Sequence, residues 1–267
     1  MKFTKMEGLG NDYIYLNCME KAPRDLPALA VQMSDRHFGV GSDGLICICP
    51  SRTADFQMRM YNADGSEGAM CGNGIRCVGK FVYDKGLTDK CEIDVETKSG
   101  VKHLKLLVEK KRVTAATVDM GVPTWDSPRK IVVKGKTYTV TPVSVGNPHI
   151  VLYVDDVARL DLSAIGPYFE NHQSFPGRVN TEFVQVLDRT HLKMRVWERG
   201  SGETLACGTG ASAVLTASVL CGASERDATI HLLGGDLSIR WDEQDDHIYM
   251  TGPAVTVFEG EWPDTTH

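Results

Sequence analysis

Long apolar runs and basic stripes are both missing from this sequence. No window reaches the roughly 18 consecutive apolar residues of a membrane-spanning helix, and residues 1–8 contain no apolar stretch of signal-peptide length. The formal net charge is −6, and no run of Lys and Arg exceeds a few residues. A nucleic-acid-binding surface or a polybasic membrane anchor requires clustered positive charge. We therefore expect a cytoplasmic protein that binds neither nucleic acid nor membrane.

The 8 cysteines also lack the spacing of a metal site. No CxxC pair is present, so the sequence predicts no metal centre. In a reducing compartment the thiols stay free of disulfides. Cys47 and Cys49 alternate with isoleucines, which predicts a buried strand in which cysteine serves as a small apolar residue.

One glycine motif, at residues 39–44, has the spacing of a dinucleotide-binding loop. Such a loop has to open a helix. Here it leads into the strand-like segment 45–49 instead, and we therefore predict no nucleotide cofactor.

What the sequence does contain is an internal repeat with an offset of 136 residues. The offset carries residues 58–62 onto 194–198, and Cys71-Gly72-Asn73-Gly74 onto Cys207-Gly208-Thr209-Gly210. It also carries Gly10-Asn11 onto Gly146-Asn147. An offset that holds without gaps over so much chain indicates a duplicated structural unit.

Each half is rich in strand-like segments and has one principal helix, directly after its Cys-Gly-x-Gly. We expect helices at residues 27–35, 75–84, 165–170 and 211–220. We expect strands at residues 3–6, 13–18, 45–49, 91–97, 101–108, 130–143, 149–154, 183–187, 192–197, 230–233, 236–241 and 247–251.

This pattern predicts an α+β fold of two pseudo-symmetric lobes. The 267 residues are enough for such a pair, with 42% apolar and 24% charged residues. A break near 113–118 would separate a first lobe, 1–115, from a second, 116–253. The segment 255–262 is expected to return to the first lobe, which residues 254–267 would complete.

Cys71 and Cys207 are the strongest candidates for catalysis. Each precedes a Gly-x-Gly at the start of a helical segment, where unpaired N–H groups and the helix dipole bind anions and lower the pKa of a thiol. If the lobes pack about a pseudo-twofold axis, the two thiols face each other across one substrate carbon. One thiolate then removes a Cα proton and the opposite thiol returns one, which is a two-base epimerisation.

A polar set surrounds these thiols in the repeat. Asn11 and Asn147 are mates under the offset, Asn62 is the mate of Glu198, and Tyr13 is the mate of His149. Asparagine is common in turns. The paired set nevertheless favours a site for an amino-acid head group, with Arg199 available to a carboxylate and His149 able to influence a thiol. The members of this set are Asn11, Asn62, Asn147, His149, Asn180, Glu198 and Arg199.

Together these motifs resemble the diaminopimelate epimerase family over nearly the whole chain. The resemblance rests on residues 8–12, 61–66, 70–77, 146–149, 178–180, 198–200 and 206–210. It implies a pyridoxal-independent isomerase of lysine biosynthesis that interconverts LL- and meso-2,6-diaminopimelate without a cofactor. It also implies that each lobe is a curved, mostly antiparallel sheet around a central helix, and that two copies form a homodimer.

The same resemblance implies roles for individual residues. Cys71 and Cys207 are the acid/base pair, conventionally the donor and the acceptor, and His149 and Glu198 tune their pKa values. Gly72, Asn73, Gly208 and Thr209 hold the reacting carboxylate. The rest of the substrate is held by Asn11, Asn62, Asn147, Asn180, Glu198 and Arg199.

Two positions depart from the family pattern. Many relatives have Gln where this chain has Gly44, so no side-chain contact is expected there. Many have a dimer-interface Tyr where this chain has Phe258, which removes a hydroxyl from the expected dimer contact.

Two alternatives remain open. A proline-type racemase uses the same paired thiols but needs no distal head-group site, so Asn180, Glu198 and Arg199 argue against it. A thiol-based redox sensor or metal-binding module would instead use a Cys71–Cys207 disulfide or a bound metal as its working state.

Overall fold

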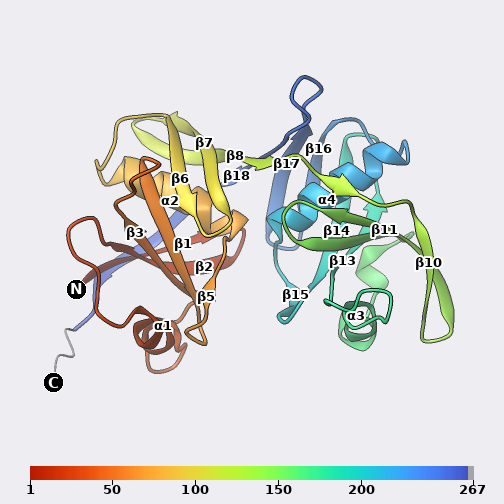
Figure 1. Ribbon diagram of the computed structural model, residues 1–267, viewed down its shortest axis with the longest axis horizontal. Coiled ribbons are helices and arrows are strands. Elements are labelled where there is room, and N and C mark those ends of the chain that lie inside the picture. Colours follow the sequence, from red (N-terminus) through yellow and green to blue (C-terminus); the bar gives the residue numbers. More distant parts are fainter. Residues whose placement is uncertain (264–267) are drawn as a thin grey trace. The chain divides into compact units, whose positions relative to one another are not determined.

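The computed structural model describes residues 1–263, and the chain forms two compact units (Figure 1). Unit 1 is Met1–Val118 together with the segment from Gly252 onward, and unit 2 is Asp119–Thr251. The first lobe was expected to end with residues 254–267, of which 264–267 lie outside the described residues.

Unit 1 is a mostly antiparallel sheet. Its strands are paired in the order β19-β1-β2-β3-β4-β6-β7-β8, and only β2–β3 and β4–β6 run parallel. A short β5 pairs with β4. The bounds are β1 (Lys2–Gly8), β2 (Asn11–Asn17), β3 (Gly44–Cys49), β4 (Phe56–Asn62), β5 (Glu67–Gly68), β6 (Glu92–Thr97), β7 (Gly100–Glu109), β8 (Arg112–Gly121) and β19 (Val255–Glu261).

Unit 2 repeats this order and these directions. Its strands are paired in the order β10-β11-β12-β13-β14-β16-β17-β18, with β12–β13 and β14–β16 parallel. Short strands β9 and β15 pair with β11 and β14. The bounds are β9 (Thr124–Trp125), β10 (Arg129–Val133), β11 (Lys136–Ser144), β12 (Pro148–Tyr153), β13 (Asn180–Val186), β14 (His191–Glu198), β15 (Gly202–Thr204), β16 (Asp227–Leu232), β17 (Gly235–Trp241) and β18 (Ile248–Pro253).

The helices follow the 136-residue offset without deviation. In unit 1, α1 is Leu26–Ser34 and α2 is Gly72–Asp84, and in unit 2 α3 is Leu162–Glu170 and α4 is Gly208–Leu220. An aspartate, Asp25 or Asp161, accepts a backbone N–H at the start of α1 or α3, which satisfies an unpaired donor of the first turn. A short 3-10 helix, η1 (Val157–Arg159), precedes α3.

The central helices α2 and α4 are enclosed by their sheets (Figure 1). Burial covers ten residues of each helix, as expected of a helix without a solvent-facing stripe. The α+β class predicted from the sequence is confirmed. The second helix of each unit, α1 or α3, packs instead over its own cluster of apolar residues.

One expectation about the strands was wrong. The single strand expected at 130–143 is the hairpin β10–β11, because Lys134 and Gly135 both adopt positive φ, 50° and 77°, as tight hairpin turns require. The break expected near 113–118 to separate the lobes lies within β8, and unit 1 ends at Val118 in the same strand.

No helix described between residues 1 and 263 combines the length and apolar character that a bilayer crossing needs.

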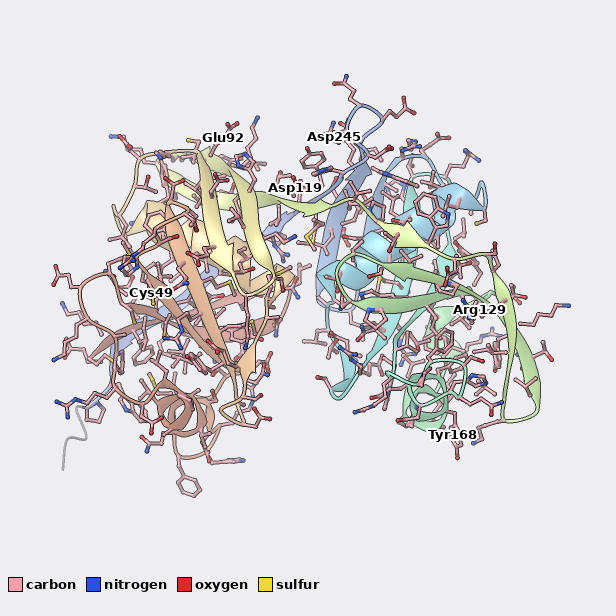
Figure 2. All side chains as sticks on the ribbon, in the orientation of Figure 1. Cys49, Glu92, Asp119, Arg129, Tyr168 and Asp245 are labelled. Carbon is pink, nitrogen blue, oxygen red and sulfur yellow. The ribbon has the colours of Figure 1, made fainter. Side chains whose placement is uncertain are left out.

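The view with all side chains places Cys49 at the end of β3 (Figure 2). Cys47 and Cys49 are both buried there, as the alternating pattern predicts.

Candidate active site

Two cysteines occupy the same structural position, one in each unit. Cys71 is the residue before the first turn of α2, and Cys207 is the residue before the first turn of α4. Each sulfur accepts the backbone N–H of the residue three positions later, Gly74 at 3.3 Å and Gly210 at 3.4 Å. The thiols thus cap helix starts, where further N–H groups remain available to an anion.

A side chain at the third helical position would displace a neighbouring side chain because the helix lies against its sheet there. A Cβ on Gly74 would come within 2.7 Å of Ile46 Cδ1 on β3, and a Cβ on Gly210 within 2.9 Å of Glu182 Oε1 on β13. Real Cβ atoms do not make contacts this short, so the Cys-Gly-x-Gly pattern sets how closely each helix start approaches a strand.

In unit 1 the Cys71 thiol lies beside Asn11 and Tyr13. Its sulfur donates to Asn11 Oδ1 at 3.0 Å, and Asn11 Nδ2 donates to Asp43 Oδ2 at 2.7 Å. The Tyr13 hydroxyl also interacts with Cys71 and Asn11. Burial, followed by the Cys71 and Asp43 charges, raises the pKa of Tyr13, so this phenol stays protonated and can donate.

The other predicted unit 1 residues are held by their own helix or turn. Asn73 Oδ1 accepts Arg76 Nη1 at 3.0 Å, and the fully buried Arg76 also donates to Gly72 O at 3.1 Å. Asn62 Nδ2 donates to Ser66 Oγ at 3.0 Å, within the turn after β4. The structure therefore brings Asn11 to Cys71, whereas Asn62 bonds within its turn.

In unit 2 four of the predicted residues form one connected chain. Cys207 Sγ lies 3.5 Å from Thr209 Oγ1, which accepts Asn147 Nδ2 at 3.3 Å. Asn147 Oδ1 lies 3.0 Å from His149 Nε2. The other ring nitrogen of His149 lies 2.7 Å from Glu182 Oε1, and both side chains are completely buried.

The pKa of the Cys207 thiol differs from the sequence-based expectation. Position at a helix start was expected to lower it, but burial, followed by the charges of Glu198 and Glu182, raises it well above the ordinary value. The Thr209 hydroxyl and the Gly210 N–H act in the opposite direction and are outweighed. Desolvation disfavours the thiolate more than the helix start favours it, so Cys207 is protonated at neutral pH.

Asn180 links the two loops that carry the remaining unit 2 residues. Its Nδ2 donates to Pro148 O at 2.8 Å, and its Oδ1 accepts the backbone N–H of Arg199 at 2.9 Å. The Arg199 guanidinium is exposed and donates to Gly177 O at 3.2 Å. Glu198 accepts the Thr204 hydroxyl at 2.5 Å.

The two departures from the family pattern have distinct surroundings. A Cβ on Gly44 would lie 2.1 Å from Tyr61 O, so the backbone here has no room for any side chain. Phe258 on β19 is 46% exposed and packs edge-on against Phe3.

Within residues 1–263, no group of three or more Cys, His, Asp or Glu side chains is arranged to hold a metal ion.

Glu182 was not identified from the sequence. A signal was available, because this glutamate stands within the otherwise strand-like and buried segment 179–184. A carboxylate is very rarely buried without a partner, so its position in such a run indicates a paired or functional group.

Comparison with solved structures identifies the fold. A phenazine biosynthesis protein of Bacillus anthracis superposes with a TM-score of 0.77 at 15% identity, over 98% of this chain and 99% of that chain. A hydroxyproline epimerase of Agrobacterium vitis superposes with a TM-score of 0.69 at 14% identity, over 97% of this chain and 90% of that chain. At these identities the likeness establishes the fold alone.

Each unit has one helix-capping thiol, and the sequence comparisons place the chain among the epimerases. The family model described as diaminopimelate epimerase matches residues 3–125 and 141–257. The diaminopimelate epimerase of Acetivibrio thermocellus is 58% identical, over 98% of this chain and 98% of that protein. The chain therefore belongs to the diaminopimelate epimerase family, which confirms the resemblance seen in the sequence.

Proposed function

We propose that this chain interconverts LL- and meso-2,6-diaminopimelate, with Cys71 and Cys207 as the two acid/base groups. The observation that carries the proposal is the duplication of one arrangement: a thiol before the first turn of a buried helix, with a glycine-lined set of N–H groups beside it. A two-base mechanism needs two such groups, one for each face of the reacting carbon.

The proposed reaction transfers one proton off the substrate and one proton onto it. A thiolate takes the Cα proton, the electron pair is delocalised onto the carboxylate, and the opposite thiol donates a proton to the other face of Cα. The N–H groups of Gly72, Asn73, Gly208 and Thr209 stabilise the charge that develops on the carboxylate. Because its pKa is raised, we assign Cys207 as the acid. Cys71 is then the base once its thiol has lost the proton that it donates to Asn11, and the two roles exchange in the reverse reaction.

We assign the distal amino-acid head group of the substrate to the side chains beyond the thiols. The exposed guanidinium of Arg199 suits a carboxylate, and Glu198 suits an ammonium group. Asn180 supports this assignment because it fixes the backbone of Arg199 at 2.9 Å. A proline-type racemase has no use for a second head group, so diaminopimelate is the better-supported substrate.

Deuterium uptake at Cα in D₂O tests this function directly. Purified protein is incubated with LL-diaminopimelate or L-proline, without added cofactor, and mass spectrometry follows the substrate. We expect uptake into diaminopimelate only, and the rate should not fall when reductant or chelator is added. Uptake that required pyridoxal phosphate would contradict the proposed mechanism. Loss of activity with reductant would instead support a redox sensor.

We further propose that units 1 and 2 are the two catalytic lobes, and that the chain works in the cytoplasm as a homodimer. On β19, Val255, Val257 and Phe258 are all 44–53% exposed, which suits a contact with a second copy. Light scattering should give the mass of a dimer for the wild type, and a smaller mass for Phe258→Asp. A wild-type monomer would contradict the dimer proposal. Cell fractionation tests the location.

A further inference from the structure

The buried carboxylate of Glu182 has no place in the mechanism described so far. It lies on β13, beneath the first turn of α4, and is completely inaccessible. Oε1 is 2.7 Å from His149 Nδ1, whereas Oε2 has no hydrogen-bond partner among the described residues. Burying an ionisable group costs free energy even when the group is paired. The presence of Glu182 here therefore points to a use for its pairing with His149.

The hydrogen bonds around His149 fix which atoms carry protons. Asn147 Nδ2 donates to Thr209 Oγ1, so it is the oxygen of this amide that faces His149 Nε2 at 3.0 Å. An amide oxygen only accepts, and Nε2 must therefore be the N–H donor. The contact between Nδ1 and Glu182 then needs one further proton, shared between the ring and the carboxylate.

The next hydrogen bond is also donated toward Cys207. Thr209 Oγ1 accepts from Asn147, which leaves its own hydrogen for Cys207 Sγ at 3.5 Å. All donors between Glu182 and Cys207 thus point toward the thiol. A donor aimed at sulfur stabilises the thiolate, which this enzyme needs whenever Cys207 acts as the base.

We propose that Glu182 is a positioning residue for the reaction: by binding His149 Nδ1 it keeps the proton on Nε2, orients Asn147, and so directs the Thr209 hydroxyl toward Cys207. This inference rests on the proposed function of Cys207 as an acid/base group. Glu182 makes no hydrogen bond to the sulfur, and the scheme gives it no contact with the substrate. Its effect on the Thr209 hydrogen bond passes through the side chains between them, in addition to the direct effect of its charge on the pKa of Cys207.

Two substitutions separate this role from simple packing. Glu182→Leu fills the space with an apolar side chain and leaves Nδ1 without its partner. Glu182→Gln keeps a polar group there, whose amide can either donate to or accept from Nδ1. Glu203→Leu is the matched control. It removes a carboxylate of β15 that binds Arg195 and that takes no part in the hydrogen bonds between Glu182 and Cys207.

NMR of the ring nitrogens of His149 is the direct test, with the signals assigned by their loss in His149→Gln. We expect a protonated Nε2 in the wild type, in Glu182→Gln and in Glu203→Leu. In Glu182→Leu both nitrogens should shift toward the averaged values of an unrestrained imidazole. A wild-type Nε2 without a proton would overturn the proposal even if Glu182→Leu did not fold. An unchanged ring in Glu182→Leu would overturn it as well.

Kinetics give a second readout. For Glu182→Leu we expect kcat to fall about 10- to 100-fold, as it does when a hydrogen-bond partner of a metal-bound histidine is removed, with a much smaller change in KM. Glu182→Gln should recover most of the loss. Full activity in Glu182→Leu would contradict this inference and leave the proposed function intact. A wild type without deuterium exchange would contradict the proposed function, while the NMR result would still decide the state of His149.

Discussion

The two halves share a backbone but differ in the residues beneath their central helices. Under the offset that carries Cys71 onto Cys207, Ile46 corresponds to Glu182, and Tyr13 corresponds to His149. Ile46 packs against the start of α2 where Glu182 lies against the start of α4. The thiol of unit 1 therefore has a phenol and an amide beside it, whereas the thiol of unit 2 lies above a buried imidazole–carboxylate pair.

This difference shows which features of a duplicated site are constrained by the fold. The helix starts, their glycines and the strand pairings are shared by both units, and the glycines lie where each helix start approaches its sheet closely. The side chains facing the thiols are free to diverge. Two thiols in similar backbone positions thereby acquire different neighbours, and burial with nearby carboxylates raises the pKa of Cys207.

The largest expected effect comes from removing either thiol. Cys71→Ala and Cys207→Ala should each reduce kcat/KM for epimerisation by about a thousandfold or more, because a two-base reaction fails when one proton carrier is missing. Chiral chromatography of the product measures this effect. Cys91→Ala, at an exposed cysteine, is the control and should retain full activity. A single thiol variant with more than about a tenth of the wild-type activity would contradict the mechanism.

Transferring the carboxylate to the other half should strongly destabilise the protein. Ile46→Glu buries a charge beneath α2 with no imidazole to pair with it, and we expect a loss of about 3–5 kcal/mol in the free energy of unfolding. Adding Tyr13→His should recover part of that loss, because it supplies the partner found in unit 2. Urea unfolding of the two single variants and the double variant gives the coupling energy. A coupling energy near zero would show that residues 46 and 13 of unit 1 cannot form the pair that Glu182 and His149 form in unit 2.

A smaller effect on stability is expected from exchanging the residues at positions 44 and 180, which correspond under the 136-residue offset. Gly44→Asn would place its Cβ 2.1 Å from Tyr61 O, and the backbone shift should cost about 1–3 kcal/mol of stability. The reverse change, Asn180→Gly, removes two hydrogen bonds and should cost about 1–2 kcal/mol. Thermal or urea unfolding measures both. Wild-type stability in Gly44→Asn would mean that the strand yields without penalty.

The smallest effect concerns Cys77, whose mate is Ala213. Burial raises the pKa of Cys77 to about 12, from an ordinary value of 9.0. The folded state therefore holds this proton more tightly than the unfolded chain, and wild-type stability should fall as the pH rises from about 9 toward 12. Cys77→Ala lacks this contribution. Between about pH 9 and pH 10, the wild type should lose about 1 kcal/mol relative to Cys77→Ala in urea unfolding. Parallel pH profiles would contradict a buried, neutral thiol.

Sequence reasoning predicted the family, the fold class and all four α-helices. The helices after the thiols begin at Gly72 and Gly208, three residues before the predicted starts, because Gly-x-Gly looks like a turn until a capping residue is assigned. The hairpin at Lys134 and Gly135 was missed because a two-residue turn interrupts an otherwise uniform strand pattern only slightly.

The electrostatics of the site could not be predicted in the same way. The raised pKa of Cys207 depends on Glu182, 25 positions earlier in the chain, and on burial that exists only once β13 and β14 pair. A local rule about helix starts contains neither contribution. Glu182 itself was visible in the sequence as a charge in a strand-like segment, but nothing in the sequence paired it with His149.

The pairing of β1 with β19 has a consequence for how the chain is made. Unit 2 is one continuous stretch, Asp119–Thr251, whereas the sheet of unit 1 ends on a strand that lies near the other end of the sequence. During synthesis β1 leaves the ribosome early and must wait for β19, and domains generally fold as units during synthesis. The half that is translated first is therefore completed last, after the second half has had time to fold.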